Sequence, residues 1–153
     1  MSNRLPQEKE EFFWSIVRET RKNSRFDEND NYIMHGKTTV KGHCINVAYT
    51  AYYLTYKLGI ETNEAELIRG ALLHDYFLYD WHEKSWANSI HGYTHPGKAL
   101  KNAKQDFDLS AIERDMIKHH MFPLTPRIAR SREGKVLCVA DKLCAIKETI
   151  HRR

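Results

Sequence analysis

Apolar side chains recur at intervals of three and four residues along most of this chain, and no segment shows the alternation typical of a half-buried strand. The pattern is clearest over Val40–Leu58, which is followed by Gly59, a residue common just beyond the end of a helix. Amphipathic helices bury their apolar faces against one another. The sequence therefore predicts an all-α fold, a single-domain bundle of about six to seven helices.

Other segments carry signals for the start of a helix. Asn63 and Ser110 each stand three residues before a glutamate, which is the spacing of a capping box. Thr94 can cap a further helix with Pro96 in its first turn. An aromatic, irregular stretch occupies residues 76–94. The expected helices cover residues 7–22, 40–58, 63–74, 94–103, 110–120 and 132–150.

Length and composition predict one domain over residues 1–153, because a chain of this size can enclose one core but not two. Hydrophobic residues make up 41% and charged residues 29% of the chain, near the usage of globular proteins. No apolar run approaches the length that crosses a membrane, and residues 1–11 are too polar for a secretion signal. We therefore expect a cytoplasmic protein with no membrane partner.

The number and spacing of the cysteines are also those expected of a cytoplasmic protein. The three cysteines, Cys44, Cys138 and Cys144, are odd in number and lack C-x-x-C spacing. This argues against a disulfide framework and against a thiolate zinc site. We expect all three to be small core residues.

The net charge of +4 is unevenly spread along the chain. Residues 98–153 contain 13 basic and 7 acidic side chains, whereas residues 1–97 contain 11 basic and 13 acidic ones. An anionic ligand would be drawn toward the C-terminal half. The basic residues alternate with acidic ones and form no nucleic-acid motif, so we expect no nucleic-acid partner.

Histidines are unusually frequent, with nine in the chain, and several stand at the ends of expected helices. Neutral imidazoles and carboxylates together suit Mn, Fe, Zn or Mg, rather than copper or an iron–sulfur cluster. Each expected helix after the first supplies one or two such groups, within it or just beyond its end. The candidate groups are His43, His74, Asp75, His95, His119, His120 and Asp141.

The dipeptide His74-Asp75 closes an apolar segment, Ala71-Leu72-Leu73, and so places two polar groups in the last turn of a buried helix. A buried aspartate without a partner would be costly. A bound cation removes that cost, because one carboxylate can bridge two ions while the neighbouring imidazole binds one of them. The simpler interpretation, in which the pair only caps the helix, is the commoner one for an isolated dipeptide.

The order of these residues resembles the HD superfamily of metal-dependent phosphohydrolases. That signature is a histidine, then His-Asp, then one or two further histidines, then a distal aspartate. The chain is most similar to small bacterial HD-domain proteins, and the likeness extends over residues 35–147. The matching stretches are Gly42-His43-Cys44, Ala71-Leu72-Leu73-His74-Asp75, His95-Pro96, Ile117-Lys118-His119-His120 and Val139-Ala140-Asp141-Lys142.

The resemblance implies a centre for one or two divalent ions, drawn from Mn, Fe, Zn, Mg, Co and Ni. One ion would take His43, His74, Asp75 and Asp141. A second would share Asp75 and take His95 and one of the pair His119 and His120, of which we prefer His120. The resemblance also assigns catalytic roles to His74 and Asp75 themselves.

Other residues are expected around this centre. His91 could bind the metal, support a metal ligand or contact the substrate, of which we expect the second, and it could also relay a proton. We expect Tyr76 to line a substrate pocket. Many relatives have Ile-Gly-Lys after the dipeptide, and this chain has Tyr-Phe-Leu, so another cation must meet the phosphate. Lys142, as a catalytic cation, and Lys98 lead, and Arg132 is a further candidate.

The resemblance predicts a hydrolase that acts on a small phosphate ester, such as a nucleotide, by metal-activated water. No Gly-Tyr-Pro motif follows His119-His120, which argues against one subclass of cyclic-dinucleotide phosphodiesterase. The alternatives are a mixed-valence di-iron oxygenase on the same ligands and a non-catalytic protein that binds metal and nucleotide. The substrate, the type of phosphohydrolase and the oligomeric state stay open.

Overall fold

The computed structural model describes residues 4–22, 24–31, 33–35, 38–76, 91–123 and 126–150. Within these residues the fold is all-α, as predicted, and six α-helices make up most of it. A six-residue 3-10 helix and a short antiparallel hairpin, which the sequence pattern did not predict, lie between the first two α-helices. The elements are α1 (Gln7–Arg21), η1 (Phe26–Asn31), β1 (Ile33–His35), β2 (Thr38–Thr39), α2 (Val40–Leu58), α3 (Glu64–Leu72), α5 (His91–Asp106), α6 (Ala111–His119) and α7 (Arg132–Ile150).

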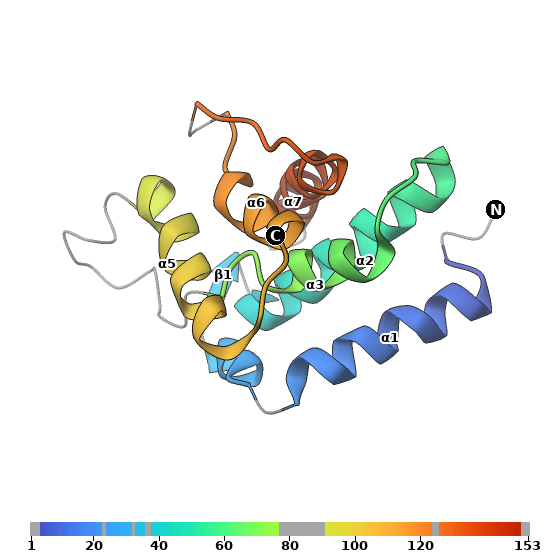
Figure 1. Cartoon of the computed structure of the whole chain (residues 1–153), viewed down its shortest axis with the longest axis horizontal. Helices are drawn as coiled ribbons and strands as arrows, with labels where there is room; N and C mark the ends of the chain where they lie inside the picture. Colours follow the sequence, from blue (N-terminus) through green and yellow to red (C-terminus); the bar gives the residue numbers. More distant parts are fainter. Residues whose placement is uncertain are drawn as a thin grey trace.

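Helices α2 and α3 form the middle of the bundle (Figure 1). Helix α1 runs along one side of them and packs against α3, while α6 and α7 cover the other side. Helix α5 packs against α6 at one end of the molecule. None of the helices in the described ranges is long and apolar enough to cross a membrane.

The core forms on the helix faces that the apolar spacing indicates. On α2 the buried set includes Val40, Cys44, Val47 and Ala51, which follow one another by three or four residues and so share one face. Full burial of a large apolar side chain contributes about 1.5–3 kcal/mol. All three cysteines are buried and form no disulfide, as expected for small core residues.

Local caps define most helix ends. Thr39 accepts a hydrogen bond from the backbone N–H of Gly42 at the start of α2, and Gly59 ends that helix with a left-handed φ of 65°. Gly is favoured there because it has no Cβ to clash in that region. The capping box predicted at Ser110 is present, with both of its hydrogen bonds to Glu113.

The capping box predicted at Asn63 is only half formed. The side chain of Asn63 accepts from the backbone N–H of Glu66 at 3.2 Å. Its own backbone N–H, however, donates to the carboxylate of Glu133 in α7 at 2.7 Å. A residue distant in the chain has therefore taken the place of Glu66 in the reciprocal bond, and this bond ties the start of α3 to α7.

The predicted start of the fourth helix was wrong. Helix α5 begins at His91, so Thr94 is not its cap and His95 does not open it. Pro96 lies inside the helix, at its sixth position. A proline there removes one intrahelical hydrogen bond and disfavours the helical region for the residue before it, which is why the sequence placed a boundary at this point.

Candidate metal centre

Two imidazoles and two carboxylates meet where α2, α3 and α7 pack together. His43 lies on the buried face of α2, Asp141 lies in α7, and His74 and Asp75 directly follow α3. One nitrogen or oxygen from each of these four residues lies within 4.8 Å of all the others. His43, His74 and Asp75 are at most 3% exposed. The predicted ligand set of the first ion is therefore brought together by the fold.

The distances within this cluster suit a shared cation. Nε2 of His43 lies 2.8 Å from Oδ1 of Asp141 and 3.6 Å from Oδ2 of Asp75. Nε2 of His74 lies 3.1 Å from Oδ2 of Asp75 and 3.2 Å from Oδ1 of Asp141. With metal–ligand bonds of about 2.0–2.2 Å, neighbouring ligand atoms of one ion are about 3.0–3.5 Å apart. The donor atoms therefore fit a divalent ion with little rearrangement.

The histidines are held with the same ring orientation. Nδ1 of His74 donates to the carbonyl oxygen of Ala71 at 2.6 Å, and Nδ1 of His120 donates to that of Ile117 at 2.8 Å. Because a carbonyl oxygen only accepts, the proton must be on Nδ1. Nε2 of both rings is left to face the carboxylates, which is the arrangement that binds a metal.

His120 adds a second side to the cluster. Its Nε2 lies 3.5 Å from Oδ1 of Asp75, whereas the other oxygen of Asp75 faces His74 and His43. The ring of His120 meets that of His74 edge to face, with centroids 4.9 Å apart. A carboxylate whose two oxygens face different imidazoles has the orientation needed to bridge two ions.

The neighbouring His119 takes a different direction. Its Nδ1 lies 3.0 Å from Oδ1 of Asp115, and the other oxygen of Asp115, Oδ2, accepts hydrogen bonds from the backbone and side chain of Ser131. Nε2 of His119 is buried and has no hydrogen-bond partner among the described residues. Of the pair, His120 is thus the residue that faces the cluster.

The electrostatics of the cluster favour positive charge at its middle. Burial works to lower the pKa of the His43 imidazole, but hydrogen bonds to Asp141 and Glu148 carry it well above its ordinary value. Burial also works to lower the pKa of the His74 imidazole, but the charges of Asp75 and Asp141 raise it well above its ordinary value. The pKa of Asp141 lies far below its ordinary value, because hydrogen bonds from both histidines outweigh its burial. A divalent ion supplies the positive charge that these carboxylates otherwise draw from protons.

Lys142 lies beside the cluster. Its ammonium group donates to the carbonyl oxygen of His120 at 3.4 Å and contacts Sγ of Cys138 at 3.1 Å. The side chain is half-buried.

Two residues expected to contact substrate are placed elsewhere. The ring of Tyr76 is fully buried, and its hydroxyl group donates to Asp106 and accepts from the backbone N–H of Arg25. Arg132 opens α7 and donates to the carbonyl oxygen of Glu61 at 3.2 Å. It stands nine residues before Asp141, about 13 Å along the helix axis. Helix packing therefore directs both side chains away from the cluster.

The remaining expected residues lie partly outside the described structure. Lys98 is exposed on α5. His91 and His95 belong to the same helix, but their side chains lie outside the described residues. Their predicted roles therefore stay predictions.

Sequence reasoning missed Glu148. This carboxylate is 8% exposed and accepts from Nδ1 of His43 at 2.8 Å. It follows Asp141 by seven residues in α7, two helical turns, so the two side chains share one face of the helix. That spacing is the one signal in the sequence that could have pointed to Glu148.

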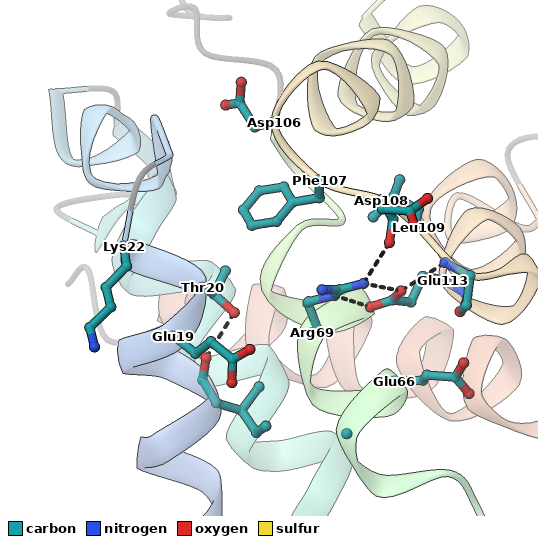
Figure 2. A pocket seen from close by; sticks show the side chains of 13 residues that line it. Glu19, Thr20, Lys22, Glu66, Arg69, Asp106, Phe107, Asp108, Leu109 and Glu113 are labelled. Atoms are coloured by element: carbon teal, nitrogen blue, oxygen red, sulfur yellow. Dashed lines mark hydrogen bonds and ion pairs between the residues drawn. The ribbon is translucent and has the colours of Figure 1, made fainter.

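A hollow of about 580 Å³ lies between α1, α3 and the segment that joins α5 to α6 (Figure 2). Arg69 is half-buried in it and binds both oxygens of Glu113 and the carbonyl oxygen of Asp108. None of the four cluster residues lines this hollow. Its charged groups are used to tie α3 to α6, and the cluster remains the candidate functional site.

An all-helical domain that buries two imidazoles and two carboxylates around one point defines a candidate metal-binding helical protein. More narrowly, the chain belongs to the HD domain family, whose model matches residues 40–146. The match includes the whole four-residue cluster and His120, and it ends before Glu148. No curated protein and no solved structure gives a significant match to the chain. The family includes metal-dependent phosphohydrolases, and the resemblance stated from the sequence is confirmed at the level of the family.

Proposed function

We propose that this protein is a metal-dependent phosphohydrolase that acts on a small phosphate ester, such as a nucleotide. The observation that carries the proposal is the cluster of His43, His74, Asp75 and Asp141, whose donor atoms lie within 4.8 Å of one another in the core. Membership of the HD domain family supports the same chemistry.

The roles of the residues follow from this geometry. A divalent ion bound at the cluster would polarise the phosphate and lower the pKa of a water molecule to about 7 in a favourable site. His43, His74 and Asp141 would hold that ion with Oδ2 of Asp75. Oδ1 of Asp75 and Nε2 of His120 would hold a second ion, with His95 as a further ligand by resemblance.

The phosphate also needs a positively charged side chain, and we propose Lys142. Its bond to the carbonyl oxygen of His120 is long, at 3.4 Å, so a phosphate oxygen can replace it. Lys98 is proposed as a second cation, and His91 as a proton relay. The excess of basic over acidic residues in the C-terminal half would draw an anionic substrate toward these groups.

We also propose that the protein acts in the cytoplasm. The supporting observation is that Cys44, Cys138 and Cys144 are buried thiols without a disulfide, which is typical of a reducing compartment. A compact substrate is favoured because the sequence carries no recognised nucleic-acid motif.

The experiment that tests the function begins with protein purified without added metal, in which bound metals are quantified. Phosphate monoesters, diesters and nucleotides are then screened with Mn²⁺, Mg²⁺, Co²⁺ and Fe²⁺. His74→Ala and Asp75→Ala should lose turnover, while Glu8→Gln, a change of an exposed carboxylate on α1, should keep it. Unchanged turnover in both cluster variants would refute the catalytic assignment.

The same experiment separates the alternatives. Metal binding without turnover of any ester would indicate a non-catalytic binding protein. Two bound irons together with consumption of oxygen would indicate an oxygenase that uses the same ligands. Either result would replace the proposed hydrolase while leaving the metal centre in place.

A further inference from the structure

The side chain of Glu148 holds the imidazole of His43, one of the four residues of the cluster. His74 and His120 each donate from Nδ1 to the carbonyl oxygen three residues earlier. His43 donates from Nδ1 to the carboxylate of Glu148 instead, at 2.8 Å. We propose that Glu148 is a positioning residue that fixes the ring of His43 for metal binding, an inference that rests on the proposed metal centre.

The contact fixes both the orientation and the protonation of the ring. Oε2 of Glu148 accepts the Nδ1 proton, so Nε2 of His43 points at Asp141 and Asp75. A carboxylate on the far side of a ligating imidazole strengthens the nitrogen as a ligand, because it stabilises the positive charge that the ring gains on binding a cation. Glu148 is 8% exposed and His43 is 1% exposed, so water does not compete strongly for this bond.

Glu148 is itself held in place by α2. Its second oxygen, Oε1, lies 3.5 Å from the amide nitrogen of Asn46. Asn46 follows His43 by three residues, so both groups lie on neighbouring turns of the same face of α2. The carboxylate of Glu148 therefore contacts two positions on α2.

Helix α7 thus supplies both a ligand and the anchor of another ligand. Asp141 faces Nε2 of His43 at 2.8 Å and Glu148 faces Nδ1 at the same distance, two turns further along. A straight helix keeps residues seven apart on nearly the same face, so one packing of α7 against α2 positions both carboxylates. Glu148 lies just beyond the residues matched by the family model, 40–146.

The test compares Glu148→Gln and Glu148→Ala with His43→Ala and the exposed control Glu8→Gln, all in the full chain. The affinity for Mn²⁺ alone is measured by calorimetry, and the unfolding temperature is measured to show that each variant is folded. Nitrogen-15 NMR of the metal-free protein, recorded at a pH above the pKa of His43 so that the ring is neutral, reports which ring nitrogen of His43 carries a proton.

We expect Glu148→Ala to bind Mn²⁺ about 10- to 100-fold more weakly than the native chain, the range seen when such outer partners are removed. Glu148→Gln should lose less, because its amide oxygen still accepts the Nδ1 proton while the negative charge is gone. In the NMR spectra, His43 should keep its Nδ1 proton in Glu148→Gln and lose this fixed state in Glu148→Ala.

The outcomes separate this inference from the proposed function. If Glu148→Ala binds Mn²⁺ like Glu8→Gln while His43→Ala loses binding, the positioning role is refuted and the metal centre stands. If the native chain and His43→Ala bind equally poorly, the metal centre is refuted, and the NMR signal alone decides the role of Glu148. A His43 signal that is the same in Glu148→Ala and in the native chain would then overturn the positioning role of Glu148. If the alanine variant does not fold, the Mn²⁺ affinity and the His43 signal of Glu148→Gln are compared with those of the native chain instead.

Discussion

Asp75 directs its Oδ1 toward His120, with 3.5 Å between this oxygen and the imidazole Nε2, while its Oδ2 serves the other two histidines. One carboxylate therefore joins two groups of imidazoles. This division is the structural basis for expecting two ions rather than one.

Replacement of His120 should remove one ion and leave the other. We expect His120→Ala to lower the amount of bound metal per chain by about half, because His43, His74 and Asp141 still surround Oδ2 of Asp75. Elemental analysis after dialysis gives the ratio. His119→Ala is the matched control, since its Nδ1 is turned toward Asp115. Equal losses of metal in the two variants would contradict the division of roles.

Replacement of Lys142 should reduce the stabilisation of the transition state and leave the stability of the fold unchanged. A hydrogen bond to a charged group contributes about 1.5–3 kcal/mol, so Lys142→Met should lower kcat/KM by about 10- to 100-fold. Steady-state kinetics with the best ester from the screen measure this change. Lys147→Met changes an exposed lysine of the same helix and should leave kcat/KM within about two-fold. A Lys142 variant that behaves like the Lys147 variant would exclude the ammonium from phosphate binding.

The contact between Asp106 and its partners should make stability depend on pH. Burial acts to raise the pKa of the Asp106 carboxyl, but hydrogen bonds from Arg25 and Tyr76 outweigh it and leave the pKa below its ordinary value. The folded chain therefore releases this proton more readily than the unfolded chain, so the contact stabilises the fold above about pH 4 and is lost as the pH falls further.

Asp106→Asn tests this directly. At pH 7 the variant should be less stable by about 1–3 kcal/mol, and the difference from the native chain should shrink as the pH is lowered from 5 to 3. Urea unfolding at each pH gives the free energy of unfolding. Asp108→Asn, two residues away and exposed, should differ little from the native chain at any pH. A constant difference for Asp106→Asn across the range would show that its charge is not responsible.

The pair formed by Arg69 and Glu113 should behave as a unit. Glu113 is 1% exposed and is bound at both oxygens by the guanidinium of Arg69, which also meets the carbonyl oxygen of Asp108. Removal of one partner leaves a buried charge without its counterion, so Arg69→Ala should destabilise the fold by about 3 kcal/mol or more. Denaturant unfolding of Arg69→Ala, Glu113→Ala and the double variant forms the cycle that measures the coupling. A double variant whose loss equals the sum of the single losses would refute the coupling.

Much of the helical framework could be predicted from the sequence, because it depends on contacts between residues close in the chain. The left-handed Gly59 at the end of α2 and the capping box of Ser110 and Glu113 are both formed within five residues. The order of histidines and aspartates also identified the family and named the four residues of the cluster, since the positions of motifs can be read directly along the chain.

Relationships between distant residues required the tertiary structure. The proton of His43 is accepted by Glu148, 105 positions away, and the cap of Asn63 is completed by Glu133, 70 positions away. The choice of His120 over His119 depends on the turn at the end of α6, which directs neighbouring side chains to different sides.

The sequence by itself determined which segments become helices and which residue types could hold a metal, because backbone hydrogen bonding and capping act over a few residues. The packing of α2, α3 and α7 decided which atoms meet, as the burial of Tyr76 and the separation of Arg132 from the cluster illustrate. The reason is geometric, since a helix offers many faces to its neighbours and only the packed core fixes which face is turned toward the site.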